Sequence, residues 1–474
     1  MKILLINPPF YKLYNDSHSF TQYPLSLGYL AATLKKETDC QVSVYDADFP
    51  DHIHRLKNKE LTTFGFDNYL KNLNDPAADI WQQILKIIKK QNPDLVGITS
   101  NTQNFKSTLN IAKLIKTYNK KIPIIVGGPH PSLDGPASIN NPYIDICVQG
   151  EGEKTIVELI NALKNKKNLK TIKGICFKKN KKIIQNPPRE FIPNLDSLPF
   201  PHQYIPKTLI NYKKYPLISF RGIFATRGCP NNCMFCGSKN IWSRHTRYRS
   251  PQNIIKEITN LTKYGHQYIR FEDDTFGGMN KQYIDNLCNL MIKKCPGLKW
   301  ECEMNVSAVT ESTISLMKKA GCRSIQLGIE SGNNQILKEI HKNITIEQAI
   351  SASKIIKNHN ILLEVFFMVG FPQETENSLN DTLNAINKID ANFTVYSIFT
   401  PYPGTEIFKY CQDKQLVDSN FDISLYNHQS PMNCFCLNLS PLKFRSLVSR
   451  IEKVIDRKNF TLKNKIQRFI AKKL

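Results

Sequence analysis

The stretch "LISFRGIFATRGCPNNCMFC", residues 217–236, joins an apolar run to three closely spaced cysteines. Cys229, Cys233 and Cys236 have the spacing C-x₃-C-x₂-C, which is neither the paired C-x₂-C of a zinc site nor a lone redox C-x-x-C. Three thiolates can hold a cubane iron–sulfur cluster by three of its irons, which leaves the fourth iron open to a small ligand. A structural zinc site would need a fourth ligand, for which His245 is available. The compact spacing favours the cluster.

The cysteines begin a long series of alternating strand and helix patterns. We expect strands at 217–226, 268–276, 298–306, 324–330, 362–371 and 393–400. Helical periodicity lies between them, at 251–264, 282–294, 311–320, 345–359 and 376–388. Six such units predict an incomplete TIM-like barrel at 216–405, whose active site lies at the carboxyl ends of the strands. Because the cysteines directly follow the first strand, the predicted cluster lies at that catalytic end.

Residues 1–155 contain a second alternating series. Continuous apolar runs predict buried parallel strands at 2–7, 41–47, 95–100, 122–128 and 144–150, with helices between them. This pattern predicts a flavodoxin-like doubly wound domain with its ligand beyond the carboxyl ends of the strands. The turns at those ends offer glycines that admit a large flat ligand and uncharged hydrogen-bonding groups. The candidate residues are Asn7, Pro8, Thr102, Gln103, Gly127, Gly128, His130, Gly150, Glu151 and Gly152.

Two further segments complete the predicted organisation. Residues 156–215 are expected to be a connector with a helix, a hairpin and a proline-rich run. Residues 406–474 are expected to be a helical extension that ends in a basic amphipathic helix. That tail, 460–474, either covers the barrel or rests on an anionic membrane surface. Cys434 and Cys436 in this extension are interpreted as buried apolar cysteines.

The composition limits the partners and the location. The net charge is +24, but lysine occurs in almost every segment. We therefore interpret the excess of lysine as a compositional bias of the solvent-exposed surface and expect no nucleic-acid partner. The apolar runs are too short for a membrane helix, and the N-terminal run is too short for a signal peptide. We therefore expect a cytoplasmic protein, with peripheral membrane contact as an option. Its 13 cysteines would then be free thiols or metal ligands.

The sequence resembles the radical S-adenosylmethionine (SAM) superfamily, whose signature is C-x₃-C-x-aromatic-C after the first barrel strand. "FEDDTF" (271–276), "LGIESG" (327–332), "GFPQET" (370–375) and "TPYPGT" (400–405) are similar to its motifs at the strand ends. Residues 1–155 resemble the cobalamin-binding domain of one branch, through "INPP", "YPLSLGYLAA" (23–32), "DLVGITS", "VGGPHPS" and "GEGE". The resemblance covers about residues 1–410.

The resemblance implies three cofactors: a 4Fe–4S cluster, SAM and cobalamin. Cys229, Cys233 and Cys236 would hold the cluster, and SAM cleavage would give a 5′-deoxyadenosyl radical. Glu272 and Asp273 would contact the methionine amine, and Glu330 the ribose hydroxyls. The whole implied set of SAM contacts is Glu272, Asp273, Gly328, Glu330, Ser331 and Gly332. The cobalamin contacts would be the turn residues of 1–155 named above.

The resemblance implies a C-methyltransferase that acts on a small-molecule or lipid-like substrate, with flavodoxin or ferredoxin as electron donor. Radical cyclisation or rearrangement, tRNA methylthiolation and a non-catalytic cobalamin sensor are alternatives. Methylthiolation is disfavoured because residues 1–215 contain only three widely spaced cysteines, and the intact triad argues against a sensor. Two departures from the family stand out. His18 lacks the full cobalt-ligand motif, and Asn305 stands where relatives often have arginine.

Overall fold

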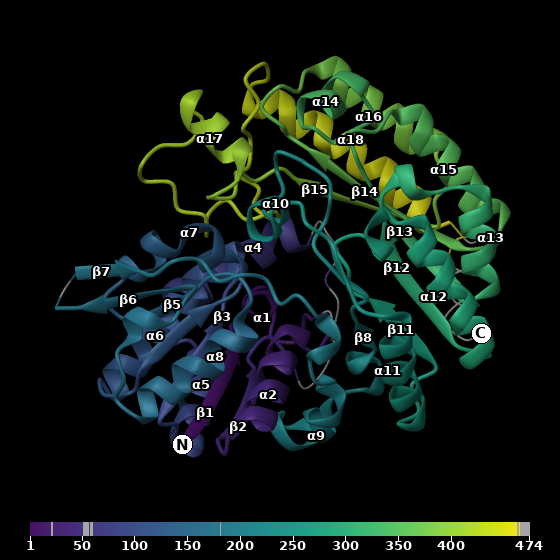
Figure 1. The fold of residues 1–474 in the computed structure, drawn as a ribbon. Helices are drawn as coiled ribbons and strands as arrows, with labels where there is room; N and C mark the ends of the chain where they lie inside the picture. The colour runs from purple at the N-terminus through teal and green to yellow at the C-terminus, as the bar shows by residue number, and fades with distance from the viewer. Residues whose placement is uncertain (20–21, 51–55, 57–59, 181, 462–463, 465–474) are drawn as a thin grey trace. The chain divides into compact units, whose positions relative to one another are not determined.

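The computed structural model describes residues 1–474 except 20–21, 51–55, 57–59, 181, 462–463 and 465–474 (Figure 1). The chain divides into two compact units. Unit 1 consists of Met1–Phe220 together with Asp422–Pro431, and unit 2 begins at Arg221 and resumes at Met432.

Unit 1 is built on a seven-stranded sheet with the order β2-β1-β3-β4-β5-β6-β7. The first five strands pair in parallel, and the order 2-1-3-4-5 is that of flavodoxin-like folds. The predicted doubly wound fold is therefore confirmed. The strands are β1 (Lys2–Asn7), β2 (Gln41–Asp46), β3 (Leu95–Thr99), β4 (Ile124–Gly127), β5 (Ile146–Val148), β6 (Ile175–Lys179) and β7 (Lys182–Gln185).

Helices cover both faces of this sheet because alternate strand residues point to opposite sides. Leu4 and Ile6 of β1 pack into one apolar cluster with helices α4 to α7, whereas Ile3 and Leu5 pack into the other with α2 and α8. The helices are α1 (Tyr11–Tyr14), α2 (Leu25–Glu37), α4 (Phe66–Asn74), α5 (Asp79–Gln91), α6 (Phe105–Tyr118), α7 (Pro129–Asn140), α8 (Gly152–Lys164) and α9 (Ile205–Thr208).

Two segments that the sequence placed outside the first domain lie in unit 1. Within 156–215, β6 pairs antiparallel with β5, so the expected hairpin extends the sheet. Residues 422–431 also belong to unit 1, where the Tyr14 hydroxyl donates to Asn427 Oδ1 at 2.9 Å. The sequence carries no local signal for this long-range packing.

Unit 2 contains a six-stranded sheet with the order β15-β14-β13-β12-β11-β8, in which every pair is parallel. Sequential parallel strands with helices between them confirm the predicted partial (βα)₆ barrel. The strands of the sheet are β8 (Gly222–Ile223), β11 (Tyr268–Phe271), β12 (Lys299–Met304), β13 (Cys322–Glu330), β14 (Leu362–Val369) and β15 (Phe393–Ile398).

The five helices predicted between the strands of unit 2 are present, each within one residue of its expected ends. In β14, Leu363, Val365 and Phe367 are buried, whereas the residues between them are partly exposed. The helices are α10 (Ser238–Trp242), α11 (Pro251–Lys263), α12 (Lys281–Lys294), α13 (Glu311–Lys319), α14 (Asn334–Glu339), α15 (Ile346–Asn358), α16 (Glu376–Lys388), α17 (Glu406–Asp413) and α18 (Pro441–Asn459). The basic tail after α18 lies almost wholly outside the described residues.

The first predicted barrel strand, 217–226, is shorter than expected. Residues 217–220 form a turn of 3₁₀ helix, β8 has two residues, and β9 (Thr226–Arg227) pairs instead with β10 (Arg247–Tyr248). Asp273 accounts for the break, because its carboxylate accepts the backbone N–H groups of Ala225 and Thr226. The chain therefore leaves the sheet just before the cysteines.

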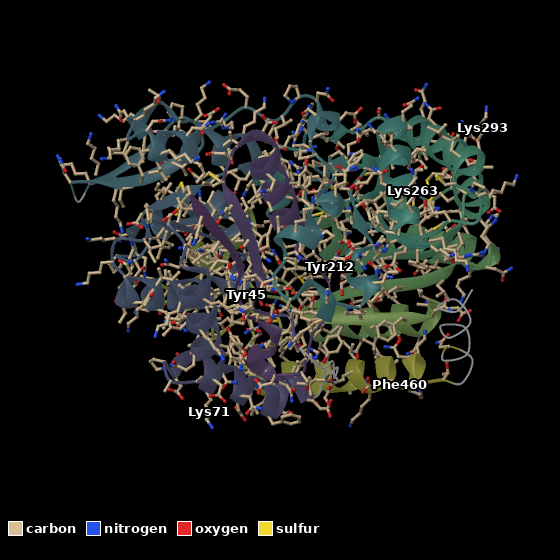
Figure 2. All side chains as sticks on the ribbon, turned by 90° about the horizontal axis from the view of Figure 1, so that it is seen from below. Tyr45, Lys71, Tyr212, Lys263, Lys293 and Phe460 are labelled. Atoms are coloured by element: carbon tan, nitrogen blue, oxygen red, sulfur yellow. The ribbon has the colours of Figure 1, made fainter. Side chains whose placement is uncertain are left out.

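Lysines are spread over both units, as Figure 2 shows for Lys71, Lys263 and Lys293. All three side chains are exposed and lie on different helices. This distribution agrees with a solvated surface. No helix among the described residues is long and apolar enough to cross a membrane.

Candidate active site

The three cysteines lie on a loop at the carboxyl end of the first strand of unit 2. Cys233 is buried, whereas Cys229 and Cys236 are half-buried. The loop folds back on itself, because the N–H of Cys236 donates to the carbonyl of Cys233 at 3.2 Å. Met234 anchors it by a backbone hydrogen bond to Ile340 at 3.0 Å. The sulfurs are thus presented on a loop that is fixed to the barrel.

The loop begins at a glycine that no other residue could replace without strain. Gly228 has φ +98°, and a Cβ at this position would lie 2.2 Å from the carbonyl oxygen of His245. The sequence therefore fixes the direction in which the chain enters the cysteine loop. His245 itself, the alternative zinc ligand, has an exposed side chain.

The thiols fit a cluster better than a single ion. Burial raises the pKa of Cys236 to about 11 and also raises that of Cys233, so a bound cation would be needed to hold them as thiolates. Among the described residues, no three His, Cys, Asp or Glu side chains converge on one metal position. A cubane does not require such convergence, because each thiolate binds a different iron.

Glu272 and Asp273 follow β11 but have different environments. Glu272 is partly exposed and forms an ion pair with Arg270, 3.0 Å from carboxylate oxygen to Nε. Asp273 is buried and accepts hydrogen bonds from Ala225, Thr226 and the Thr226 hydroxyl, with Gly277 N–H at 3.4 Å. These contacts favour a positioning role for Asp273 over the predicted contact with SAM, whereas Glu272 keeps an accessible carboxylate.

Glu330 ends β13 in an unusual backbone conformation. The strand has an irregular register between Gly328 and Glu330, and Glu330 has φ +72°. A bulge of this kind re-aims a side chain at the end of a strand. The Glu330 carboxylate accepts a hydrogen bond from Lys342 Nζ at 2.7 Å, and both side chains are nearly buried. A Cβ on Gly328 would lie 2.7 Å from the same carboxylate oxygen, so only glycine leaves room for this pair.

Ser331 and Gly332 pack against α16. The backbone N–H of Gly332 donates to Thr382 Oγ1 at 2.9 Å, and the Ser331 hydroxyl, which is fully buried, lies 3.4 Å from the same atom. A Cβ on Gly332 would lie 2.5 Å from the Cα of Thr382 in α16. These two residues therefore hold the turn after Glu330 against a helix.

Sequence reasoning missed the basic residues of the site. Lys342 lies beside Glu330, and its charge also lowers the pKa of Cys233. Arg270 contacts Glu303 at 2.9 Å as well as Glu272, on neighbouring strands. The spacing of Arg270 and Glu272, two residues apart at the end of β11, was the one signal for a pair on the same face, whereas Lys342 lies in a loop without a motif.

Asn305, where relatives often have arginine, makes only local contacts in the structure. Its Oδ1 accepts from the backbone and the hydroxyl of Ser307, and its N–H donates to Thr275 at 3.1 Å. It thus caps the turn after β12 rather than reaching outward.

The predicted turn residues of unit 1 come together at one sheet edge. His130 N–H donates to the carbonyl of Ser100 after β3, and its Nδ1 lies 3.2 Å from Thr102 Oγ1. Ser132 links the next two turns, because its hydroxyl donates to Gly128 and accepts from the N–H of Gly150. The ends of β3, β4 and β5 thus form one continuous edge.

Other predicted residues frame this edge. Asn7 donates to Asp46 at 2.8 Å, beside Pro8, and Glu151 is buried with its carboxylate accepting the N–H of Ile192. Gly150, in contrast, is exposed, and a Cβ there would meet nothing within 4 Å. The remaining predicted residues on these turns, all at least partly exposed, are Gln103, Gly127, Gly128 and Gly152.

The histidines of unit 1 are buried. Burial lowers the pKa of His130 to about 4, so the ring is neutral near pH 7 and serves as a tie between turns. His18, the weak cobalt-ligand candidate, is 1% exposed, and its Nδ1 accepts the N–H of Leu56. Both arrangements are those of packed structural histidines.

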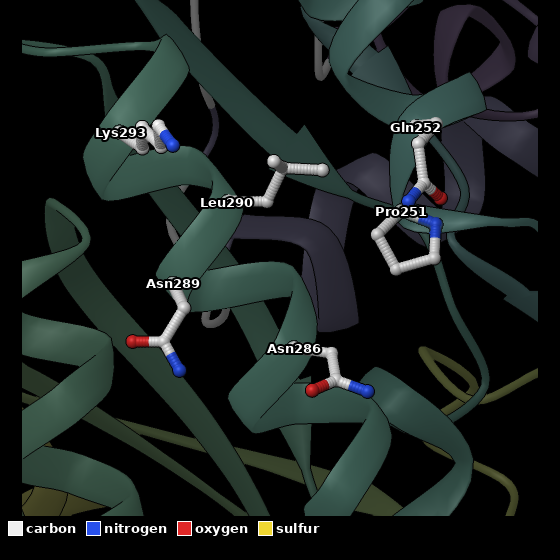
Figure 3. A pocket seen from close by; sticks show the side chains of 6 residues that line it. All are labelled: Pro251, Gln252, Asn286, Asn289, Leu290 and Lys293. Carbon is white, nitrogen blue, oxygen red and sulfur yellow. The ribbon is translucent and has the colours of Figure 1, made fainter.

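A hollow of about 540 Å³ lies between α11 and α12 of unit 2 (Figure 3). Its lining is mostly amide and apolar, with Lys293 as the single titratable side chain. It offers no group suited to acid, base or redox chemistry. The lining residues are Pro251, Gln252, Asn286, Asn289, Leu290 and Lys293.

Comparisons with known proteins identify two domains in the chain. The family model of the radical SAM superfamily matches residues 223–386, and that of the B12 binding domain matches residues 11–160. An uncharacterized methyltransferase of Pyrococcus horikoshii is 34% identical over 86% of this chain and 83% of that protein. The anaerobic magnesium-protoporphyrin IX monomethyl ester cyclase of Rubrivivax gelatinosus is 28% identical over 76% of this chain and 64% of its own length.

A solved structure shows the same fold. It is the radical SAM methyltransferase TsrM of Kitasatospora setae with cobalamin and a [4Fe–4S] cluster bound. The TM-score is 0.66 at 18% identity, and the match covers 86% of this chain and 78% of TsrM.

Proposed function

The chain belongs to the radical SAM superfamily, in the branch that carries a B12-binding domain, and we propose that it transfers a methyl group from SAM to an unactivated carbon of a small molecule. The 4Fe–4S cluster, SAM and cobalamin supply the radical and methyl-transfer chemistry when bound. The observation that carries the proposal is the shared edge of unit 2, where the cysteine loop and the bulged Glu330 follow strands of one parallel sheet. The 34% identical methyltransferase supports the reaction type.

Different residues of unit 2 are assigned to the cluster and to SAM. Cys229, Cys233 and Cys236 would hold the cluster, which would supply the electron for the cleavage of SAM. Glu330 accepts hydrogen bonds from the ribose hydroxyls, since a carboxylate with two oxygens suits a diol. Lys342 Nζ donates a hydrogen bond to one of those oxygens in the structure and orients the carboxylate.

Glu272 is the partner we assign to the methionine ammonium. Its carboxylate is held by Arg270, and burial raises its pKa, so a second cation beside it would favour the charged form. Arg270 is shared among Glu272, Glu301 and Glu303, so its charge is already offset by three carboxylates. The site therefore has negative charge left for a cationic ligand.

The sheet edge of unit 1 is the proposed cobalamin site. The exposed Gly150 and the half-exposed turns at Gly127 and Gly128 allow close approach of a large flat ligand. Thr102 and His130 brace these turns from below through their mutual contact. We assign no residue as cobalt ligand, because the buried His18 already accepts a backbone hydrogen bond.

Ring closure without methyl transfer is the second candidate, because a relative at 28% identity is named as a cyclase. That protein is longer than the matched region, which covers 64% of it. The two candidates differ in whether a second product of SAM appears.

The test is an anaerobic incubation of the reconstituted protein with cobalamin, SAM and reductant. 5′-Deoxyadenosine together with S-adenosylhomocysteine supports methyl transfer, and 5′-deoxyadenosine alone supports cyclisation or rearrangement. Neither product with cobalamin retained would indicate a sensor and would refute the proposal.

Cys233→Ala and Cys411→Ala form a matched pair for this test. Both thiols are buried in unit 2, but only Cys233 is a proposed cluster ligand. We expect Cys233→Ala to abolish 5′-deoxyadenosine formation and Cys411→Ala to retain it. Persistent cleavage by the first variant would exclude the cluster assignment.

The proposed partners are a reduced flavodoxin or ferredoxin as electron donor and, through residues 460–474, an anionic membrane surface. Lysines and apolar residues alternate at helical spacing in that tail. Truncation at residue 459 should abolish co-sedimentation with anionic liposomes if the tail binds them. Equal sedimentation of both proteins would remove the membrane proposal.

A further inference from the structure

The loops that lead from the helices of unit 2 into its strands lie together at one end of the sheet. The N–H of Lys299, at the start of β12, donates to the carbonyl of Gln267 in the loop after α11, at 3.0 Å. The N–H of Trp300 donates to the carbonyl of Gly321 in the loop after α13, at 3.2 Å. This end, where the parallel strands begin, is here called the amino edge. It is opposite to the end that carries the cysteine loop.

The last long helix of the chain also ends at the amino edge. The side chain of Asn459, the final residue of α18, forms two hydrogen bonds of 2.8 Å with the backbone of Thr394, near the start of β15. Lys458 Nζ donates to the carbonyl of Ile389, just before β15, at 2.8 Å. The basic segment 460–474 therefore begins at this edge.

The amino edge is strongly basic. In the five loops between helices and strands, at 264–267, 295–298, 320–321, 359–361 and 389–392, Asp390 is the one acidic residue. Exposed lysines end the helices α11 to α13, and Figure 2 shows two of them, Lys263 and Lys293. Among the residues that the structure describes, none of these lysines forms an ion pair. The full set is Lys263, Lys293, Lys294 and Lys319.

Large apolar side chains are exposed at the same helix ends. Tyr264 follows α11 and is 60% exposed, and Ile292 in the last turn of α12 is 41% exposed. Phe460 follows α18 and is 50% exposed (Figure 2). The helix dipole accounts for lysines at the carboxyl ends of helices, but it does not account for exposed apolar groups beside them. Lysines together with exposed aromatic and aliphatic groups suit the interface of an anionic bilayer.

We propose that the amino edge of unit 2 is a membrane-binding surface whose partner is a layer of anionic phospholipid headgroups. The four lysines contact the lipid phosphates, and Tyr264, Ile292 and Phe460 enter the headgroup region. The surface acts together with residues 460–474 and so extends the membrane contact proposed for that tail. It does not depend on the proposed methyl transfer.

This surface determines which end of unit 2 faces the lipid. The cysteine loop and Glu330 follow the carboxyl ends of the strands, so they would point away from a bilayer that contacts the amino edge. A substrate would then reach the site from the aqueous side. Of the two proposed substrate classes, the surface therefore favours a water-soluble small molecule over a lipid.

The test titrates the full chain with vesicles of equal parts phosphatidylglycerol and phosphatidylcholine. The double variant Lys293→Gln/Lys294→Gln should bind about 30-fold more weakly, from about fivefold for each lysine. Lys89→Gln/Lys90→Gln is the matched control, because these two lysines are exposed at the end of α5 in unit 1. The control should bind like the unmodified chain. Equal binding by the two double variants would overturn the proposal and leave the tail as the membrane contact.

Ile292→Ser tests the apolar part of the surface. Because this side chain is partly exposed in the free protein, its burial among lipid headgroups should strengthen binding, and its loss should weaken vesicle affinity about fivefold. The charge of the protein is unchanged in this variant, so electrostatic attraction stays the same. An unchanged affinity would overturn the entry of apolar side chains into the headgroup region.

Lysine acetylation followed by peptide mapping locates the contact in the unmodified chain. The vesicles should slow the acetylation of Lys263 and Lys319 about threefold or more and leave Lys71 on α4 unchanged. Protection by a single-stranded RNA but not by the vesicles would assign the surface to nucleic acid and overturn the proposal. No readout involves SAM or cobalamin, so failure of this proposal is distinguishable from failure of the proposed enzymatic function.

Discussion

Removal of the Lys342 charge should destabilise the end of β13, because it leaves the Glu330 carboxylate buried without a counterion. Lys342 Nζ is 2.7 Å from Glu330 Oε1, and the two side chains are 10% and 12% exposed. At an effective dielectric constant of about 20, the attraction at this distance is about 6 kcal/mol. Desolvation of both ions opposes it, and the loss of one partner of such a pair costs about 3–5 kcal/mol. We expect Lys342→Met to cost about 3 kcal/mol.

A double-mutant cycle isolates the pair from other effects of the substitutions. Lys342→Met, Glu330→Gln and the double variant would be compared by the hydrogen exchange of peptides from β13 and α14, which reports their opening free energy. We expect a coupling energy of about 2 kcal/mol or more. The exposed pair Lys281–Asp285 in α12 serves as the control, with an expected coupling below about 0.5 kcal/mol. Equal coupling in the two pairs would refute the argument that burial makes the first pair strong.

Three further predictions follow from individual contacts. Gly228→Ala should cost more than about 2 kcal/mol and reduce the iron content after reconstitution, since its Cβ would lie 2.2 Å from the carbonyl oxygen of His245. Gly328→Ala should weaken SAM binding about tenfold in equilibrium dialysis, because its Cβ would displace the Glu330 carboxylate; unchanged affinity would contradict the role of Glu330. His130 has a pKa of about 4 when folded and 6.5 as its ordinary value, so the unfolded chain binds more protons between these pH values. The contribution of His130 to the free energy of unfolding should therefore be complete above pH 6.5, and this free energy should fall by up to about 3 kcal/mol as the pH drops to 4. Urea unfolding would measure it, and His130→Asn should show a smaller fall.

The architecture of both units could be predicted because it depends on local patterns. Continuous apolar runs marked the parallel strands of unit 1, and helical spacing located α11, α12, α13, α15 and α16 to within one residue at each end, whereas the short α14 was not predicted. The positions of the cysteine loop and of Glu330 followed from the strand ends, since parallel strands deliver their carboxyl ends to one edge. These features need no knowledge of distant contacts.

The features that the sequence did not predict depend on contacts between distant residues. Lys342 reaches Glu330 from a loop twelve residues further on, and no motif marks it. Asp273 resembled a ligand by position, but its acceptor capacity is used by the backbone around Ala225. Residues 422–431 pack into unit 1 although the chain on both sides belongs to unit 2. Composition and periodicity report none of these.

The same reasoning explains why the two parts of the proposed SAM site were not equally visible. The cluster cysteines carry their whole signal in eight residues, because the loop itself spaces the ligands. The surroundings of Glu330 depend instead on Lys342 and on the room that Gly328 leaves for the pair. Spacing in the sequence can therefore identify metal ligands, whereas the orientation of a binding carboxylate depends on side chains from other segments of the fold.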